Sequence, residues 1–138
     1  MPYPEMMVAP MRQDLVRVGF RELRTAGDVD EVLGNEESSV LVAVNSVCGC
    51  AAGSMRPGVA MALENEKTPE IRTTVFAGQD LEATERAREY FTGYPPSSPS
   101  VALLKGGELV YMMERHQIEG RTADQIATDL REAFNQHL

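Results

Sequence analysis

Apolar residues recur at helical spacing near both ends of the chain. The first apolar set consists of Met11, Leu15 and Val18. Pro10 stands where the first turn of a helix tolerates proline, and Gly19 stands where a helix can end. The last apolar set consists of Ile126, Leu130, Ala133 and Phe134. Thr122 and Gln125 precede this set with the spacing of a capping box, so we predict a final helix that begins at Thr122.

Between these helices the pattern is that of β-strands. An apolar run that ends at Asn45 is typical of a strand buried on both faces. Residues 71–77 alternate and are rich in β-branched side chains. Two short apolar segments flank Lys105-Gly106-Gly107-Glu108 and predict a β-hairpin. The predicted strands span residues 20–23, 40–45, 71–77, 100–104 and 109–113.

Three more helices are predicted between the strands. Thr25 can cap the first of them, and Asp80 can cap the third. Residues 51–63 also have a helical pattern, although Pro57 and Gly58 should kink or interrupt that helix.

This order of elements predicts an α/β fold. Strands that are separated by helices form parallel pairs, whereas the hairpin must be antiparallel. We therefore expect a mixed sheet with helices on both faces and an additional N-terminal helix. A chain of 138 residues with 43% hydrophobic residues has the size and composition of one soluble domain, which we place over residues 1–138.

Charge and hydropathy limit the possible partners. The formal net charge of −8 argues against nucleic acid as a partner, because no basic patch is present to neutralise phosphates. No segment approaches the ~20 apolar residues of a membrane span, so no membrane partner is expected. The N-terminal residues lack the basic and apolar regions of a secretory signal, and we expect a cytoplasmic location.

The chain has two cysteines, and they lie one residue apart as Cys48-Gly49-Cys50. This pair follows a predicted buried strand and precedes a predicted helix, whose N-terminus favours thiolate over thiol. A disulfide between residues so close in sequence would stabilise the fold little and would be strained and readily reduced. These properties suit thiol–disulfide exchange.

Two other interpretations of the cysteines stay open. Both can be small buried apolar residues. They can also bind metal, because zinc sites use Cys and His, and two thiolates suit Cu(I). The remaining good ligands for such a site are His116 and His137.

Two segments resemble known families. Residues 98–108, Ser-Pro-Ser-Val-Ala-Leu-Leu-Lys-Gly-Gly-Glu, are similar to the proline-and-hairpin segment of thioredoxin-like proteins. The motif Val-Asn-Ser-Val-Cys-Gly-Cys-Ala-Ala-Gly at residues 44–53, with Arg56-Pro57 after it, resembles the bacilliredoxin family. Residues 115–121, Arg-His-Gln-Ile-Glu-Gly-Arg, are also similar to that family. The resemblance covers nearly the whole chain and implies a thioredoxin-like fold, with a cis peptide before Pro99.

The resemblance also implies a function. Bacilliredoxins remove bacillithiol from S-bacillithiolated client proteins, so bacillithiol would be a thiol co-substrate and no tightly bound cofactor is expected. We assign the attack to Cys48, and its resolution either to Cys50 or to a free low-molecular-weight thiol. Gly49 is expected to allow a sharp turn between the thiols. Asn45 and Pro99 are expected to position the motif and the substrate groove.

Alternatives to this function are a general protein disulfide reductase or isomerase, and a metal-binding protein without turnover. The role of three nearby residues also stays open. Arg56 either lowers a thiol pKa or is solvated, and His116 is either a surface residue or a proton shuttle. Asn45 either hydrogen-bonds the motif loop or only ends the strand. The sequence specifies neither the oligomeric state nor the client proteins.

Overall fold

The strand that precedes the cysteines lies at the centre of the fold. A computed structural model describes residues 2–138, and in it all seven residues of β2 (Ser39–Asn45) are buried. β2 pairs in parallel with β3 (Ile71–Phe76) and antiparallel with β4 (Ser100–Lys105). The outer strands are β1 (Arg21–Glu22) and β5 (Glu108–Met113), which gives the order β1-β3-β2-β4-β5.

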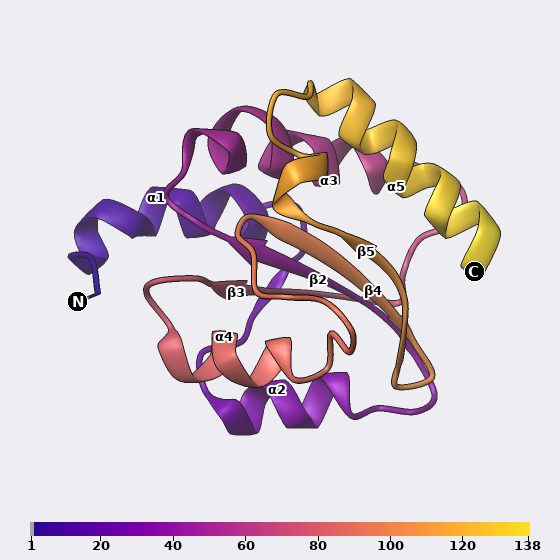
Figure 1. Ribbon diagram of the computed structural model, residues 1–138, viewed down its shortest axis with the longest axis horizontal. Helices are drawn as coiled ribbons and strands as arrows, with labels where there is room; N and C mark the ends of the chain where they lie inside the picture. The colour runs from indigo at the N-terminus through magenta and orange to yellow at the C-terminus, as the bar shows by residue number, and fades with distance from the viewer. Residues whose placement is uncertain (1) are drawn as a thin grey trace.

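Helices cover both faces of this sheet (Figure 1). One layer contains α1 (Glu5–Val16), α3 (Arg56–Ala62) and α5 (Ala123–His137). The other layer contains α2 (Ala26–Leu33) and α4 (Leu81–Arg88). Alternate residues of the central strands point to opposite layers, so Leu41 and Ala43 join one core cluster and Val42 and Val44 join the other. The predicted mixed sheet with helices on both faces is therefore confirmed.

Several predicted boundaries are also confirmed. The hairpin between β4 and β5 turns at Gly106 and Gly107, which both have positive φ. The Thr122–Gln125 capping box is present at the start of α5.

None of the helices in residues 2–138 combines the length and the apolar character that crossing a bilayer requires.

Other predicted boundaries are wrong. α1 begins at Glu5, so Pro10 lies inside the helix and not in its first turn. Asp80 precedes α4 but makes no side-chain cap, because its carboxylate accepts two hydrogen bonds from Arg12 at 2.7 and 3.0 Å. The guanidinium of Arg12 also bonds Glu5, and only 5% of its side chain is exposed. A charged group so well paired fixes α1 against the edge of the sheet.

The helix after the cysteines contains a π-helical segment, η1 (Ala51–Met55), before it continues as α3. The N–H of Arg56 bonds to the carbonyl of Ala51, five residues earlier. Pro57, which has no N–H to donate, follows this wider turn. The interruption expected at Pro57 is therefore a π-helical turn just before the proline.

Gly58 allows the close contact between α3 and α5. A Cβ added at Gly58 would lie 2.7 Å from Cγ2 of the buried Ile126 and 3.2 Å from the Ala123 carbonyl oxygen. We expect Gly58→Ala to lower the free energy of unfolding by about 1–2 kcal/mol, because overpacking outweighs the gain in helix propensity. Urea denaturation measures this change. Gly53→Ala is the control, since an added Cβ there meets no atom within 4 Å; equal stability of both variants would contradict the prediction.

Candidate active site

Cys48 is the residue from which the helix after β2 begins. Its carbonyl accepts hydrogen bonds from the N–H groups of Ala51 and Ala52, at 3.0 and 3.2 Å. Its Sγ accepts from the backbone N–H of Cys50 at 3.4 Å. The sulfur therefore occupies the position of a capping acceptor, where the free N–H groups of a helix favour negative charge.

A network of buried polar groups holds the loop between β2 and Cys48. The side-chain oxygen of Asn45 accepts from the Ser46 N–H and from Nη1 of Arg56, both at 2.9 Å. The side-chain nitrogen of Asn45 donates to the Met11 carbonyl in α1 at 3.1 Å. Arg56 also donates to the Ser46 carbonyl at 3.1 Å. Asn45 thus joins the loop to two helices, and does more than end the strand.

Arg56 has a role that neither sequence interpretation anticipated. Its side chain is 5% exposed, and its Nε lies 3.2 Å from Oδ2 of Asp14 without hydrogen-bond alignment. It is neither solvated nor bonded to a thiol. Arg56 supports the loop from beneath, and its hydrogen bonds end at Asn45 and Ser46.

The cation beside the thiol is Arg115, which follows β5. Nη2 of Arg115 donates to Sγ of Cys48 at 3.4 Å, and Nη1 donates to the Ser98 carbonyl at 3.1 Å. The peptide bond between Ser98 and Pro99 is cis, as the family resemblance implied, and Pro99 is buried. One guanidinium therefore connects the candidate nucleophile with the cis-proline loop.

The surrounding groups shift the pKa values of the two thiols in opposite directions. The pKa of Cys48 is lowered, first by the hydrogen bond from the Cys50 backbone and then by the Cys50 thiol and the charge of Arg115, although partial burial opposes this. The pKa of Cys50 is raised, first by its hydrogen bond to the Cys48 sulfur and then by burial. Both cysteines are free thiols, and Cys50 packs against the core. Cys48 is thus the better thiolate nucleophile.

Cys48 lines a groove of about 340 Å³, which we call the thiol groove. Five separate parts of the chain contribute to it: the N-terminal segment, the cysteine loop, the turn from β3 with α4, the region around the cis peptide, and the segment after β5. Its lining residues are Tyr3, Ser46, Val47, Cys48, Ala77, Gly78, Arg88, Ser98 and Arg115. Pro99 itself is beneath this surface and does not line it.

Gly49 does not have the conformation expected of it. Its φ is not in the left-handed region, it is exposed, and an added Cβ would meet no atom within 4 Å. The chain turns at Cys48 through ordinary helix initiation, so the predicted need for glycine in a sharp turn is wrong.

We therefore expect Gly49→Ala to fold normally and to exchange disulfides within about twofold of the wild-type rate, with stability equal or up to about 1 kcal/mol higher. Thermal or urea unfolding and a thiol-release assay measure both quantities. A loss of rate above tenfold at unchanged stability would instead mean that a bound client needs the space over Gly49.

His116, which we considered as a proton shuttle, is a surface residue. Its side chain is 74% exposed and its Nδ1 lies 3.8 Å from Glu114. Its neighbour Arg115 is the candidate-site residue that the sequence interpretation missed. Topology carried a signal for it: Val101 pairs with Met113, so the residues after Met113 must return to the sheet end where Pro99 lies.

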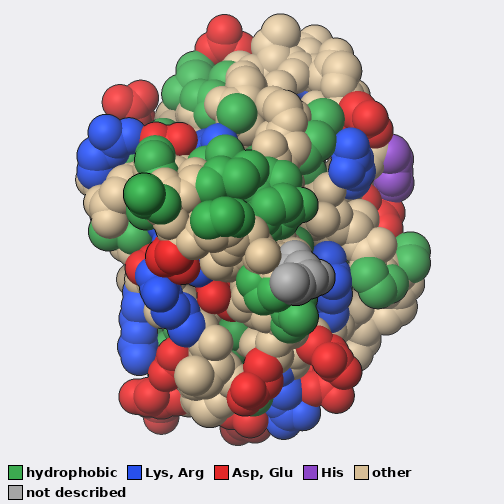
Figure 2. All heavy atoms as spheres, turned by 90° about the vertical axis from the view of Figure 1, so that its left-hand side faces the viewer, with side chains coloured by type: hydrophobic (Ala, Val, Ile, Leu, Met, Phe, Trp, Pro, Cys, Tyr) green, Lys and Arg blue, Asp and Glu red, His purple; other side chains and the backbone are tan. Residues whose placement is uncertain are grey.

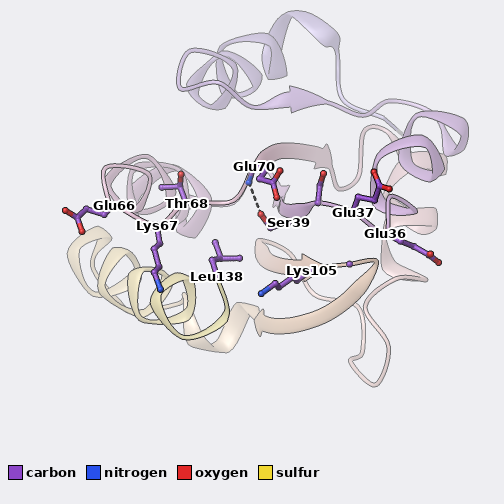
Figure 3. A pocket seen from close by; sticks show the side chains of 11 residues that line it. Glu36, Glu37, Ser39, Glu66, Lys67, Thr68, Glu70, Lys105 and Leu138 are labelled. Atoms are coloured by element: carbon purple, nitrogen blue, oxygen red, sulfur yellow. Dashed lines mark hydrogen bonds between the residues drawn. The ribbon is translucent and has the colours of Figure 1, made fainter.

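A second cavity, of about 440 Å³, lies at the opposite end of β2 (Figure 3). The Ser39 hydroxyl there accepts a hydrogen bond from the Glu70 N–H at 2.9 Å. Its lining includes acidic side chains, Lys67 and Lys105, but no cysteine. Because Cys48 lines the thiol groove and no cysteine lines the larger cavity, the smaller thiol groove is the candidate active site.

The face that carries the start of α1 is partly apolar. Figure 2 shows hydrophobic side chains gathered near the middle of this face, with acidic and basic side chains around them. In α1, Met6 is 84% exposed and Met7 is 45% exposed. Exposed apolar surface of this kind can bind a protein partner.

Known proteins resemble the whole chain. A family model described as disulphide isomerase matches residues 3–138. A bacilliredoxin of Koribacter versatilis is 56% identical over 135 residues, which cover 98% of this chain and 93% of that protein. A bacilliredoxin of Bacillus cereus is 54% identical over 136 residues, which cover 98% of this chain and 94% of that protein.

Solved structures share the fold. Thioredoxin of Fasciola hepatica has a TM-score of 0.57 at 21% identity and covers 86% of this chain and 100% of its own. Mitochondrial thioredoxin 3 of Saccharomyces cerevisiae has a TM-score of 0.56 at 15% identity, over 85% of this chain and 94% of its own. At these identities the similarity concerns the fold alone, and it confirms the thioredoxin-like fold.

Proposed function

Since the chain belongs to the bacilliredoxin family and is a thiol–disulfide oxidoreductase, we propose that it removes bacillithiol from S-bacillithiolated protein cysteines. The observation that carries this proposal is the Cys48 sulfur, which accepts hydrogen bonds from both the Cys50 backbone and Arg115 at the edge of an open groove. These contacts favour the thiolate, which is the form that attacks disulfides.

The proposed reaction begins with attack of the Cys48 thiolate on the bacillithiol sulfur. A disulfide forms between Cys48 and bacillithiol, and the client protein leaves as a thiolate. The Cys50 thiolate can then attack Sγ of Cys48, which releases bacillithiol and leaves a Cys48–Cys50 disulfide for a cytoplasmic thiol to reduce. Alternatively, a second bacillithiol attacks the bound one, which forms bacillithiol disulfide and restores the Cys48 thiolate directly.

Arg115 and the cis-proline loop would orient this attack. Arg115 holds Sγ of Cys48 and the Ser98 carbonyl at once, so the sulfur faces the groove beside the loop. Asn45 and Arg56 keep the cysteine loop fixed while the sulfur changes partner. Both are positioning residues, because neither bonds a thiol.

A general disulfide reductase or isomerase is the second candidate, because the matching family model is described as disulphide isomerase. The deciding experiment compares the release of bacillithiol and of glutathione from the same modified model protein. Faster release of bacillithiol supports our proposal, and equal rates would reduce the function to general disulfide reduction.

Metal binding without turnover is the third candidate. Among residues 2–138, no three His, Cys, Asp or Glu side chains are grouped so as to hold a metal ion. The positive charge of Arg115, 3.4 Å from the Cys48 sulfur, also opposes a cation at the pair. Stoichiometric copper or zinc in protein purified under reducing conditions, together with a thiol pair that does not oxidise, would favour this candidate.

A further inference from the structure

The thiol groove is basic although the protein is acidic. Two of its lining residues, Arg88 and Arg115, are cationic, and none is Asp or Glu. The whole chain has 13 Lys and Arg against 21 Asp and Glu. A cationic lining on an acidic protein concentrates anions at that position.

Arg88, at the end of α4, lacks the partner that a half-buried guanidinium normally has. Its Nη2 donates to the Ser97 carbonyl at 3.4 Å, and its Nε is buried without a hydrogen-bond partner. It forms no ion pair with any carboxylate in residues 2–138, and burial lowers its pKa. A desolvated charge without a counter-ion is costly, and a bound carboxylate would remove much of that cost.

Arg86, on the same helix, differs from Arg88 because it forms ion pairs. It bonds Asp30 at 2.7 Å and Glu89 at 2.6 Å, and 41% of its side chain is exposed. Arg86, which does not line the groove, is therefore paired with carboxylates. Arg88 lines the groove, and its guanidinium bonds a carbonyl but no carboxylate of residues 2–138.

We propose that Arg88 binds a carboxylate of the low-molecular-weight thiol that is joined to Cys48 during exchange. This inference rests on the proposed function, because it takes one half of the substrate disulfide to be a small thiol. A groove of about 340 Å³ suits such a molecule. A carboxylate in the groove can accept hydrogen bonds from the Nη groups of the guanidinium, which fix its orientation and compensate its charge.

This subsite would hold the small thiol throughout the transfer. The sulfur of the small thiol exchanges its bond to the client cysteine for a bond to Cys48, and the client cysteine departs as a thiolate. The carboxylate stays on Arg88 during this step. The same contact therefore favours the mixed disulfide on Cys48 for thiols that carry a carboxylate.

The test uses a model protein with one cysteine, joined by a disulfide either to mercaptohexanoate or to the uncharged mercaptohexanol. We expect wild-type protein to release mercaptohexanoate about tenfold faster, because a charged hydrogen bond in a partly desolvated site is worth about that factor. Arg88→Gln should reduce this preference below about twofold, because it slows mercaptohexanoate release more than mercaptohexanol release. Arg88→Lys should restore part of the preference, and Arg86→Gln should change neither rate.

Equal loss of both rates in Arg88→Gln would overturn the proposal, since it would mean that Arg88 only supports the Ser97 loop. Absence of any wild-type preference would overturn it as well.

If wild-type protein released neither adduct and did not release bacillithiol either, the proposed function would fail, and a second measurement would judge the subsite alone. The Cys50→Ser variant is equilibrated with the disulfide of each small thiol, and the fraction joined to Cys48 is measured by mass spectrometry. A preference for mercaptohexanoate that disappears in the Cys50→Ser, Arg88→Gln double variant supports the subsite. Equal fractions of both thiols would overturn it.

Discussion

A Cys48→Ser variant is expected to release bacillithiol from a modified model protein at least about a thousandfold more slowly than wild type, because a serine hydroxyl is not ionised at neutral pH and is a poor nucleophile toward sulfur. Cys50→Ser should still perform the first exchange and should accumulate as a mixed disulfide on Cys48. Intact-protein mass spectrometry measures both results, since the bound thiol adds its own mass.

The opposite pKa shifts of the two thiols are the reason why we expect Cys48 to attack and Cys50 to resolve. Cys50 donates to the Cys48 sulfur and packs against the core, so its own ionisation is disfavoured while Cys48 remains reduced. Full activity in Cys48→Ser together with loss of activity in Cys50→Ser would reverse the assignment of attacker and resolver. Unchanged activity in both variants would remove the cysteines from the mechanism.

Arg115→Gln is expected to lower the rate at pH 7 by about tenfold, because it removes the positive charge next to the Cys48 thiolate. The pKa of Cys48 is lowered by the Cys50 backbone first and by Arg115 as a further cause, so the variant thiol should titrate at higher pH. The rate difference should be largest below the wild-type pKa. It should vanish above the variant pKa, where both proteins are fully ionised, and the more basic variant thiolate is if anything the better nucleophile.

The pH profile of the reaction of Cys48 with an alkylating reagent measures this shift directly. His116→Gln is the matched control, since His116 is adjacent in sequence but its side chain is 74% exposed and does not line the thiol groove. Arg115→Lys should keep part of the effect because it keeps the charge but loses the bond geometry. A rate loss that persists unchanged at high pH would show that Arg115 acts on the cis-proline loop alone.

The fold was predictable where neighbouring residues determine the structure. The apolar run before Asn45, the turn at Gly106 and Gly107 and the capping box at Thr122 all depend on local sequence, and all are as predicted. Asp80 was not predictable in this way. Its carboxylate can either cap α4 or bind Arg12, which is 68 residues away, and the choice depends on how α1 packs.

The site shows the same division. The cysteine motif predicted the candidate nucleophile and the helix that follows it, since both are contiguous in sequence. Arg115 was not predicted as a partner of Cys48 because 67 residues separate the two, and the pairing of β4 with β5 brings them together. Arg56 was a candidate partner of the thiols because it is close to the motif in sequence. Its position in the helix instead directs its side chain beneath the loop, to Asn45 and Ser46.

The contacts on the Cys48 sulfur also bear on the energetic balance between the dithiol and the disulfide. A disulfide at Cys48 has no thiolate for Arg115 to attract, so this attraction is lost whenever the sulfur is bonded to another sulfur. These contacts therefore stabilise the reduced dithiol form relative to the disulfide, which corresponds to a less negative reduction potential. A weakly reducing thiol pool would then be sufficient to return the protein to working form after each turnover.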